Sequence, residues 1–325
     1  CNIKESERQL KILGYLKNVK VQTIPVSTTN NQVDVEFSVE EAPSAEASAS
    51  VGYGNNGPEL NAAFNQRNFM GTGRTVGLNF RASYWGRSYN FDYYDPYYST
   101  NGLGQGFNVF YQTVDPKKLD ITNYTSDKYG FAVNYNLFIG GLNSIQFGYG
   151  LEHLKITSLG NNPSTQLINF VAVNGQTFNQ LKLNVGWNRN SYDQQPFPTK
   201  GVNQQLSVVV ALPLSSQSLT FYKGSYAVHG YVPLLDSGFI LSAYGNVAYG
   251  NTFNNTGLPF YENYFAGGIA QPGQVRGYGS YSLGPLDSVH NSLGGNLLYN
   301  GSVGIILPYP LSRETVRTSA FFDFG

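Results

Sequence analysis

The chain has 325 residues, and its 20 Lys and Arg balance 20 Asp and Glu, so the formal net charge is zero. This balance indicates no basic surface that would favour nucleic acid binding. Charged residues make up 12% of the chain, about half the usual ~25%. Aromatic residues reach 15%, with 25 Tyr and 21 Phe. Few charges and many Tyr, Gly and Asn residues favour a surface that meets hydrocarbon on one side and water on the other.

Two classes of protein are excluded by the same inventory. No run of 18 or more apolar residues occurs, so the sequence predicts no transmembrane helix. A single cysteine excludes a disulfide framework. The mean hydropathy of −0.26 is compatible with a transmembrane β-barrel, because alternating apolar and polar residues average out.

The first forty residues are charged and differ from the rest. Residues 5–13 (ESERQLKIL) are good helix formers that end at Gly14, a natural position for a left-handed C-cap. Two strand-like runs come next, residues 17–24 and 32–40, joined by a polar turn. One helix and one hairpin are too small to bury an independent core. Cys1 could be the lipidated first residue of a mature lipoprotein, but the residues after it are typical of the middle of a domain.

From residue 44 onwards the sequence alternates with a period of two. Residues 129–137 (YGFAVNYNL), 144–152 (SIQFGYGLE) and 181–188 (LKLNVGWN) place apolar side chains on one parity and Gly, Asn or other polar side chains on the other. Successive strand residues point to opposite faces, so each strand has one apolar face. About thirteen such segments lie between Ser44 and Gly325. Most reach the ~9–11 residues that cross a bilayer.

A soluble β-sandwich would alternate too, but three features favour a membrane barrel. The polar parity is mostly Asn, Gln, Gly and Ser, as in a wet lumen. The apolar parity is dense in Tyr and Phe, as in interfacial girdles. Charges are nearly absent from that parity, where each would cost ~2–4 kcal/mol at the bilayer midplane. The sheet also needs closing partners, because an open edge cannot lie in lipid, so we expect the chain to be incomplete at both ends.

No enzymatic, metal or cofactor site is predicted. The three histidines, His153, His229 and His290, are far apart and lie in no Ser or acid motif, as surface or loop histidines do. No His, Cys and Asp spacing indicates a metal. The Gly71-Thr72-Gly73 pattern lacks the strand-to-helix context of a nucleotide loop.

A long segment near the C-terminus, residues 251–293, breaks the alternation and is much longer than an ordinary turn. Within it, QPGQVRGYGSYSLGP (271–285) carries one charge, Arg276. The parity of the last segment, TVRTSAFFDFG, predicts that Asp323 faces the lumen. A loop folded into the barrel could bring the planar fork of Arg276 to this carboxylate, with Gly277 permitting close approach. A flexible loop with a solvated arginine is the open alternative.

The motif Val275-Arg276-Gly277-Tyr278 resembles the (V/I)RG(F/Y) signature in the sixth extracellular loop of the BamA/TamA/two-partner-secretion superfamily of outer-membrane barrels. Other segments resemble the BamA branch of this family, in the same order and over essentially the whole chain. They are RQLKILGYLKNVKV (8–21), NQRNFMGTG (65–73), PFPTKG (196–201), LPFYENYFAGG (258–268) and SAFFDFG (319–325).

The resemblance implies an all-β fold, a transmembrane antiparallel β-barrel preceded by part of an α+β POTRA domain. Residues 1–42 would be the C-terminal part of the last POTRA domain. Residues 43–325 would supply about thirteen of sixteen barrel strands. The resemblance also pairs Arg276 with Asp323 as a latch for the loop. Family members often add a second acid on the preceding strand, where this sequence is expected to place Gly304, so a second acidic partner stays open.

The implied function is non-enzymatic: folding and insertion of β-barrel proteins into the outer membrane of Gram-negative bacteria, with the POTRA part in the periplasm. A first strand with a free edge would form a lateral gate on which a client strand pairs by β-augmentation; a merely weak edge strand is the alternative interpretation. The predicted gate residues are Ala45, Ala47, Ala49, Val51, Gly52 and Tyr53.

The partners implied are unfolded outer-membrane clients, accessory Bam lipoproteins that bind the POTRA domains, and outer-membrane lipid, with no cofactor, metal or nucleic acid. Two other functions stay open: a two-partner-secretion-type translocation pore and a passive porin. The segment FYENYFAGG and the POTRA-like start favour assembly over both.

Overall fold

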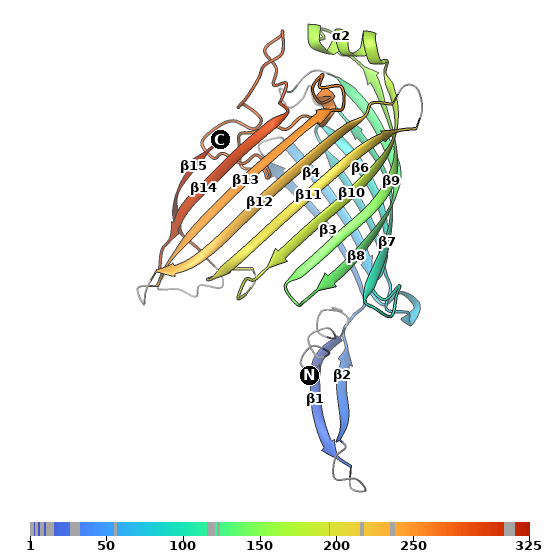
Figure 1. The fold of residues 1–325 in the computed structure, drawn as a ribbon, viewed down its shortest axis with the longest axis vertical. Coiled ribbons are helices and arrows are strands. Elements are labelled where there is room, and N and C mark those ends of the chain that lie inside the picture. Colours follow the sequence, from blue (N-terminus) through green and yellow to red (C-terminus); the bar gives the residue numbers. More distant parts are fainter. Residues whose placement is uncertain are drawn as a thin grey trace.

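The structure is a computed structural model that describes residues 16–26, 33–54, 57–115, 121, 124–194, 196–214, 218–234, 238–308 and 316–325, with 3, 6 and 10. Most of the helix predicted at residues 5–13 lies outside the described residues. The predicted hairpin is present as β1 (Leu16–Pro25) and β2 (Val33–Glu41), which pair antiparallel in a sheet of their own. This hairpin projects from one end of the large sheet (Figure 1).

The large sheet contains thirteen strands in the described part of the chain, each hydrogen-bonded to its sequence neighbours in the order β3 to β15. Every pair is antiparallel, and the sheet curves into a barrel-like wall (Figure 1). The predicted all-β antiparallel class is therefore confirmed. The strands are β3 (Ala45–Gly54), β4 (Gly57–Gln66), β5 (Thr75–Ser83), β6 (Gly86–Asp95), β7 (Leu103–Val114), β8 (Thr125–Ile139), β9 (Asn143–Ser158), β10 (Thr177–Asn190), β11 (Gly201–Pro213), β12 (Phe221–Leu234), β13 (Phe239–Thr252), β14 (Leu297–Ile306) and β15 (Ser319–Phe324).

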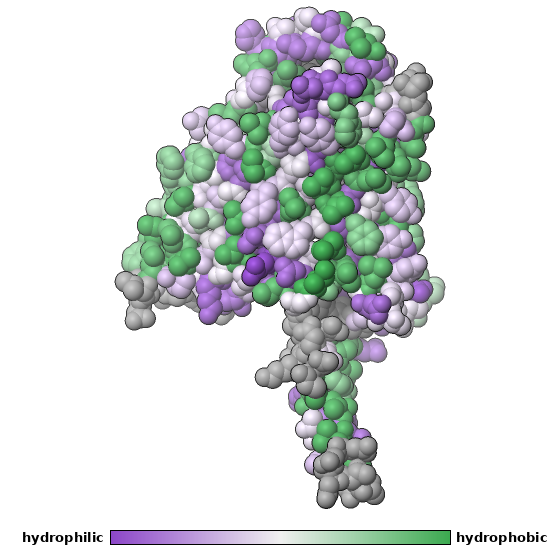
Figure 2. All heavy atoms as spheres, viewed as in Figure 1, coloured by the Kyte–Doolittle hydropathy of each residue, from purple (hydrophilic) through white to green (hydrophobic). Residues whose placement is uncertain are grey.

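The wall is not closed among the described residues, because β3 and β15 are the two ends of the strand order. Strand register explains the period of two. Leu183 of β10 pairs with Tyr149 of β9, and the next position pairs Asn184 with Gly148. Leu183 and Tyr149 are exposed on the outer face, whereas the neighbouring parity turns inward. Figure 2 shows hydrophobic residues spread over the visible wall.

The buried apolar core lies at the end of the barrel opposite the hairpin, here called the cap end. Helix α2 (Thr165–Asn174), between β9 and β10, lies there (Figure 1). The Ser164 side chain caps its N-terminus, and Gly175 follows its last residue. Among the described residues no helix has the length and apolarity needed to cross a membrane. The cap-end core contains Tyr124, Leu154, Ile156, Leu167, Phe178 and Phe260.

The segment between β13 and β14, residues 253–296, is here called the lumen loop. It contains the 3-10 helix η4 (Phe260–Glu262). Isolated antiparallel bridges, including the one between Gly268 and Val275, join its segments. Gly267 has φ +108, and an added Cβ would lie 2.5 Å from the Gly279 carbonyl oxygen. The loop therefore has a defined internal fold that depends on glycine.

Candidate functional site

Asp323 lies on the lumen face of β15. It pairs in register with Ser302 of β14, and its side chain is 4% exposed. The next residue back, Phe322, is 70% exposed on the outer face. The alternation along β15 therefore turns the Asp323 carboxylate inward, toward the lumen loop.

Arg276 of the lumen loop contacts this carboxylate with both its backbone and its side chain. Its Nε and Nη2 atoms each donate a hydrogen bond of 2.7 Å, one to each oxygen of Asp323. Its backbone N–H donates a third bond of 2.9 Å. The guanidinium also lies 3.3 Å from the ring centroid of Phe321, a cation–π contact. Two parallel hydrogen bonds from a guanidinium to a carboxylate fix orientation as well as distance. This contact therefore holds the part of the loop around Arg276, here called the loop tip, on β15.

The second side-chain partner of Arg276 is a hydroxyl. Its Nη2 donates to Ser302 Oγ at 2.9 Å. Gly304, where the resemblance places the second acid of other family members, pairs with Phe321 of β15, and Ser302 pairs with Asp323. A Cβ on Gly304 would lie only 3.0 Å from the Ser242 hydroxyl oxygen.

The other motif residues have different environments. Val275 is 1% exposed, and its backbone N–H donates to the Gly268 carbonyl at 3.0 Å. Gly277 has φ +94, and no heavy atom lies within 4 Å of where a Cβ would stand. Glycine is therefore needed there for its backbone conformation and not for lack of room. Tyr278 is exposed, with 56% of its surface accessible to solvent.

Two luminal asparagines that sequence reasoning missed support the loop tip. Asn300 of β14 donates to the Gln274 carbonyl at 3.0 Å, and Asn246 of β13 donates to the Asn300 side chain at 2.9 Å. Both are buried. Both asparagines lie at polar positions of their alternating strands, which predicts that they face the lumen. Many other asparagines share this pattern, so it did not single out these two.

The part of the lumen loop around η4 (Phe260–Glu262), here called the loop root, makes a charged contact that the sequence did not indicate. The Glu262 carboxylate in η4 lies 2.8 Å from Lys182 Nζ of β10 and 3.0 Å from Lys223 Nζ of β12. Burial would raise the pKa of Glu262, but the two lysine charges and their hydrogen bonds outweigh it and lower the pKa to about 2. Glu262 is therefore ionised and paired.

The predicted gate residues lie on β3, at the end of the strand order opposite β15. β3 pairs with β4 along its length, from Ala45–Gln66 to Gly54–Gly57. Val51 and Tyr53 are more than 80% exposed on the outer face. Gly52 lies on the other parity, opposite Glu59, so it belongs to the lumen face. The predicted latch residues thus lie in the lumen loop and on β15, and the predicted gate residues lie on β3. The outer-face set is Ala45, Ala47, Ala49, Val51 and Tyr53.

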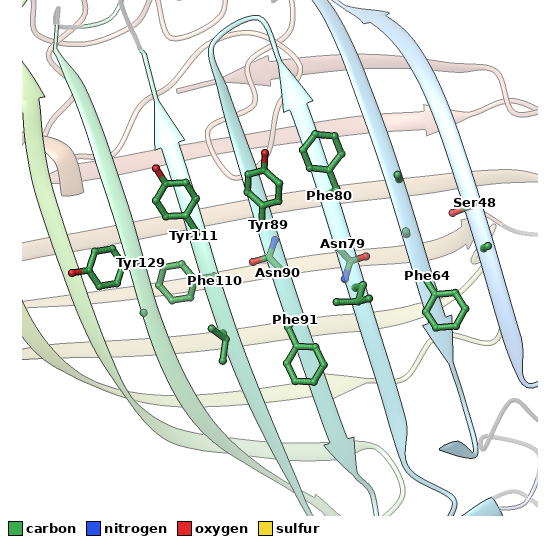
Figure 3. A pocket seen from close by; sticks show the side chains of 16 residues that line it. Ser48, Phe64, Asn79, Phe80, Tyr89, Asn90, Phe91, Phe110, Tyr111 and Tyr129 are labelled. Atoms are coloured by element: carbon green, nitrogen blue, oxygen red, sulfur yellow. The ribbon is translucent and has the colours of Figure 1, made fainter. Parts of the chain in front are cut away.

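A hollow of about 770 Å³ lies on the outer face of β3 to β8 (Figure 3). Small residues of β3 and β4, such as Ala47 and Ala62, stand beside larger rings on the next strands. The ring centroids of Phe80 and Tyr89 are 5.0 Å apart. Its apolar lining suits hydrocarbon. Among the described residues no cluster of His, Cys, Asp or Glu could hold a metal ion.

Comparison with known proteins places these features in a family. The Omp85 superfamily domain matches residues 68–325. The outer membrane protein assembly factor BamA of Neisseria meningitidis is 29% identical over 99% of this chain and 42% of its own length. BamA of Buchnera aphidicola is 23% identical over 69% of this chain and 35% of its own length. The chain spans less than half the length of these curated relatives.

Solved structures give the same result. BamA from Haemophilus ducreyi lacking POTRA domains 1–3 matches with a TM-score of 0.81 and 26% identity, over 99% of this chain and 64% of that one. CdiB from Acinetobacter baumannii matches with a TM-score of 0.57 and 15% identity, over 95% of this chain and 55% of that one, which is a likeness of fold alone. From the domain match and the shared barrel-like fold, the chain belongs to the Omp85 superfamily.

Proposed function

We propose that this chain is the membrane part of an outer-membrane protein assembly factor, which folds and inserts other β-barrel proteins. The observation that carries the proposal is the match to BamA of Haemophilus ducreyi, which extends over 99% of the chain at a TM-score of 0.81. The curated relatives that bear the assembly-factor name agree with it. The outer membrane is the location of this family, and the apolar outer face of the sheet fits it.

The proposed domain division is a POTRA end at residues 1–42 and a barrel at 43–325. The separate β1–β2 sheet and its position beyond the end of the barrel support this boundary (Figure 1). The hairpin end would then face the periplasm and the cap end the outside. Clients and accessory lipoproteins would approach from the hairpin side, through the POTRA domains.

The proposed working element is β3, as a lateral gate. One edge of β3 pairs with β4, and no other strand of the described sheet pairs with its second edge. A client strand could therefore add to that edge through backbone hydrogen bonds, which is β-augmentation. The small outward residues Ala45, Ala47 and Ala49 give a neighbour little to pack against, so such a pairing would be reversible. No covalent bond is made or broken.

The proposed role of Arg276 is a latch. Its contacts with Asp323 and Ser302 hold the tip of the lumen loop against β14 and β15. These strands lie at the far end of the strand order from β3. A loop fixed there would stabilise the shape of the barrel on that side while the β3 edge exchanges partners.

The test is reconstitution of the full-length protein in liposomes of outer-membrane lipid with an unfolded β-barrel client. The expected result is a folded, heat-modifiable client band that forms faster than in liposomes carrying a porin at equal density. Equal rates with both proteins would contradict the proposal. Ion conductance without client folding would support the passive-pore alternative instead.

A further inference from the structure

The root of the lumen loop is tied to the barrel wall by the backbone and the side chain of one residue. Lys223 Nζ of β12 donates to the Glu262 carbonyl oxygen at 2.7 Å and to its carboxylate at 3.0 Å. Lys182 Nζ of β10 donates to the other carboxylate oxygen at 2.8 Å. Two neighbouring parts of the wall therefore converge on Glu262.

Docking of the loop lowers the net positive charge of the wall cluster by one. Lys182 also donates to Glu152 of β9 at 2.8 Å. The four groups Glu152, Lys182, Lys223 and Glu262 sum to zero, whereas the three wall residues alone sum to +1. Lys128 of β8, with its Nζ 3.9 Å from Glu152, adds a further positive charge nearby. The carboxylate of the loop thus offsets one positive charge of the wall.

Aromatic side chains cover part of this cluster, in which the side chains of Glu262 and its two lysine partners are 15–21% exposed. Phe260, two residues before Glu262, is buried against Tyr124, with ring centroids 4.8 Å apart, and against Phe170 of α2, at 5.0 Å. On the other side, Lys223 Nζ lies 4.6 Å from the ring centroid of Tyr264. Charge pairs count for more where access of water is reduced, and removing one partner leaves the other charge partly buried without that partner.

We infer that Glu262 is a second docking point of the lumen loop, which holds the loop root on β10 and β12 independently of the Arg276 contact on β14 and β15. The two contacts lie well apart along the loop, at positions 262 and 276. The loop then connects β10 and β12 at its root to β14 and β15 at its tip. Release of the tip leaves the root in place, so the tip can return to Asp323. The inference rests on the proposed function for its purpose and on these contacts for its geometry.

The experiment measures docking of root and tip separately. Full-length protein with its native cysteines replaced by serine receives one reporter, Leu258→Cys at the root or Val275→Cys at the tip. Both positions are less than 10% exposed, so a bulky maleimide reagent should label them slowly. Labelling is followed in purified, folded protein without any client, so the result does not depend on whether the protein assembles clients.

Each docking variant should affect its own reporter. Glu262→Gln should increase the labelling rate at position 258 by about tenfold or more, because it leaves the partly buried Lys223 without its carboxylate. Arg276→Ala should increase labelling at 275 and leave 258 slow. Glu59→Gln, which breaks the more exposed Glu59–Arg81 pair on β4 and β5, should change neither rate.

A double variant separates charge from packing. Glu262→Gln with Lys223→Gln removes the unpaired charge, so labelling at 258 should return toward the rate of the parent. If Glu262→Gln leaves the rate at 258 unchanged, or if Arg276→Ala releases 258 as strongly as 275, the independent docking point is wrong. If the double variant labels as fast as Glu262→Gln alone, charge is not what holds the docking point. Normal docking in a protein that fails to insert clients would contradict the proposed function alone.

Discussion

Arg276 and Asp323 are 47 residues apart in the chain, and their side chains meet through two hydrogen bonds of 2.7 Å. Asp323 is buried and Arg276 is partly exposed, with side-chain exposures of 4% and 30%. The contact therefore fixes a long loop to the last described strand. Because β15 is short, from Ser319 to Phe324, the loop is also a support for β15.

The first prediction concerns the geometry of this contact. Arg276→Ala should lower the free energy of unfolding by about 1.5–3 kcal/mol, since charge-assisted hydrogen bonds are lost and Asp323 is left without its guanidinium partner. Arg276→Lys should recover only part of this loss, because an ammonium cannot grip both carboxylate oxygens as a fork does. The measurement is the temperature at which the folded band converts to the unfolded band on a gel.

The control for that series is Arg81→Ala. Arg81 pairs with Glu59 at 2.7 Å, but its side chain is 51% exposed. An exposed pair contributes about 0–1 kcal/mol, so the conversion temperature should hardly move. Equal shifts of the conversion temperature for Arg276→Ala and Arg81→Ala would show that the Arg276–Asp323 contact contributes no more to stability than an exposed pair.

The second prediction tests the hydroxyl partner. Ser302→Ala removes one acceptor of Arg276 and should cost about 0.5–1.5 kcal/mol, less than Asp323→Asn. Ser242 of β13 is a matched control, because it is also luminal and its hydroxyl donates to the Gly304 carbonyl at 3.2 Å. A double-mutant cycle of Ser302→Ala with Arg276→Ala should show coupling. Purely additive effects would mean that the Ser302 contact contributes nothing.

The third prediction concerns the fold of the loop itself. A Cβ added at Gly273 would collide with the backbone carbonyl oxygen of Phe265, so Gly273→Ala should disrupt the bridge between Gly268 and Val275. At Gly224 on β12 an added Cβ comes no nearer than 4.0 Å to the Ser207 carbonyl oxygen. Limited proteolysis should therefore cut the loop faster in Gly273→Ala and at the parent rate in Gly224→Ala. Resistance of Gly273→Ala to cleavage would contradict the described loop conformation.

The fourth prediction is a pH dependence. The pKa of Glu262 is lowered from its ordinary 4.5 to about 2, because Lys182 and Lys223 outweigh the effect of burial. A carboxyl whose pKa is lower in the folded state contributes stability that is present above pH 4.5 and is lost as the pH falls toward about 2. Glu152, Lys128, Tyr124 and Tyr261 also face this cluster.

The measurement compares the parent with Glu262→Gln across this range, since other carboxyl groups titrate in both proteins. The parent should be the more stable protein above pH 4.5, and the difference should shrink as the pH falls toward 2. A difference that stays constant down to about pH 2 would show that Glu262 is not held ionised by its lysines.

Much of the fold could be predicted because alternation is a local signal. The parity of TVRTSAFFDFG predicts an inward Asp323, and the register of β14 and β15 places it there. Helix α2 was not predicted, although Ser164 and Gly175 flank it as cap residues do. The strand pattern on both sides and the lack of charge in TQLINFVAVN hid it.

The contacts of the loop could be predicted only in part, because they depend on register and on distant residues. A sequence does not reveal which residue of β14 lies opposite Asp323, and the Ser302 hydroxyl was not predicted as a partner of Arg276. The contact between Lys182 and Glu262 joins residues 80 positions apart. In the sequence, Lys182 resembles any other luminal charge and Glu262 any other loop charge. Only the position of the loop inside the barrel shows that the two side chains meet.

The sharpest test of a gate at β3 is site-specific cross-linking of a client to this strand during insertion. Single cysteines replace Ser48 or Ser50 of β3, or Asn61 of β4, which pairs with Ser50 inside the sheet. A client stalled during assembly carries one cysteine in its last strand. A β3 gate predicts disulfides to positions 48 and 50, in a register that shifts with the client cysteine, and none to position 61. Assembly that proceeds without any cross-link to β3, or with equal cross-linking at position 61, would contradict it.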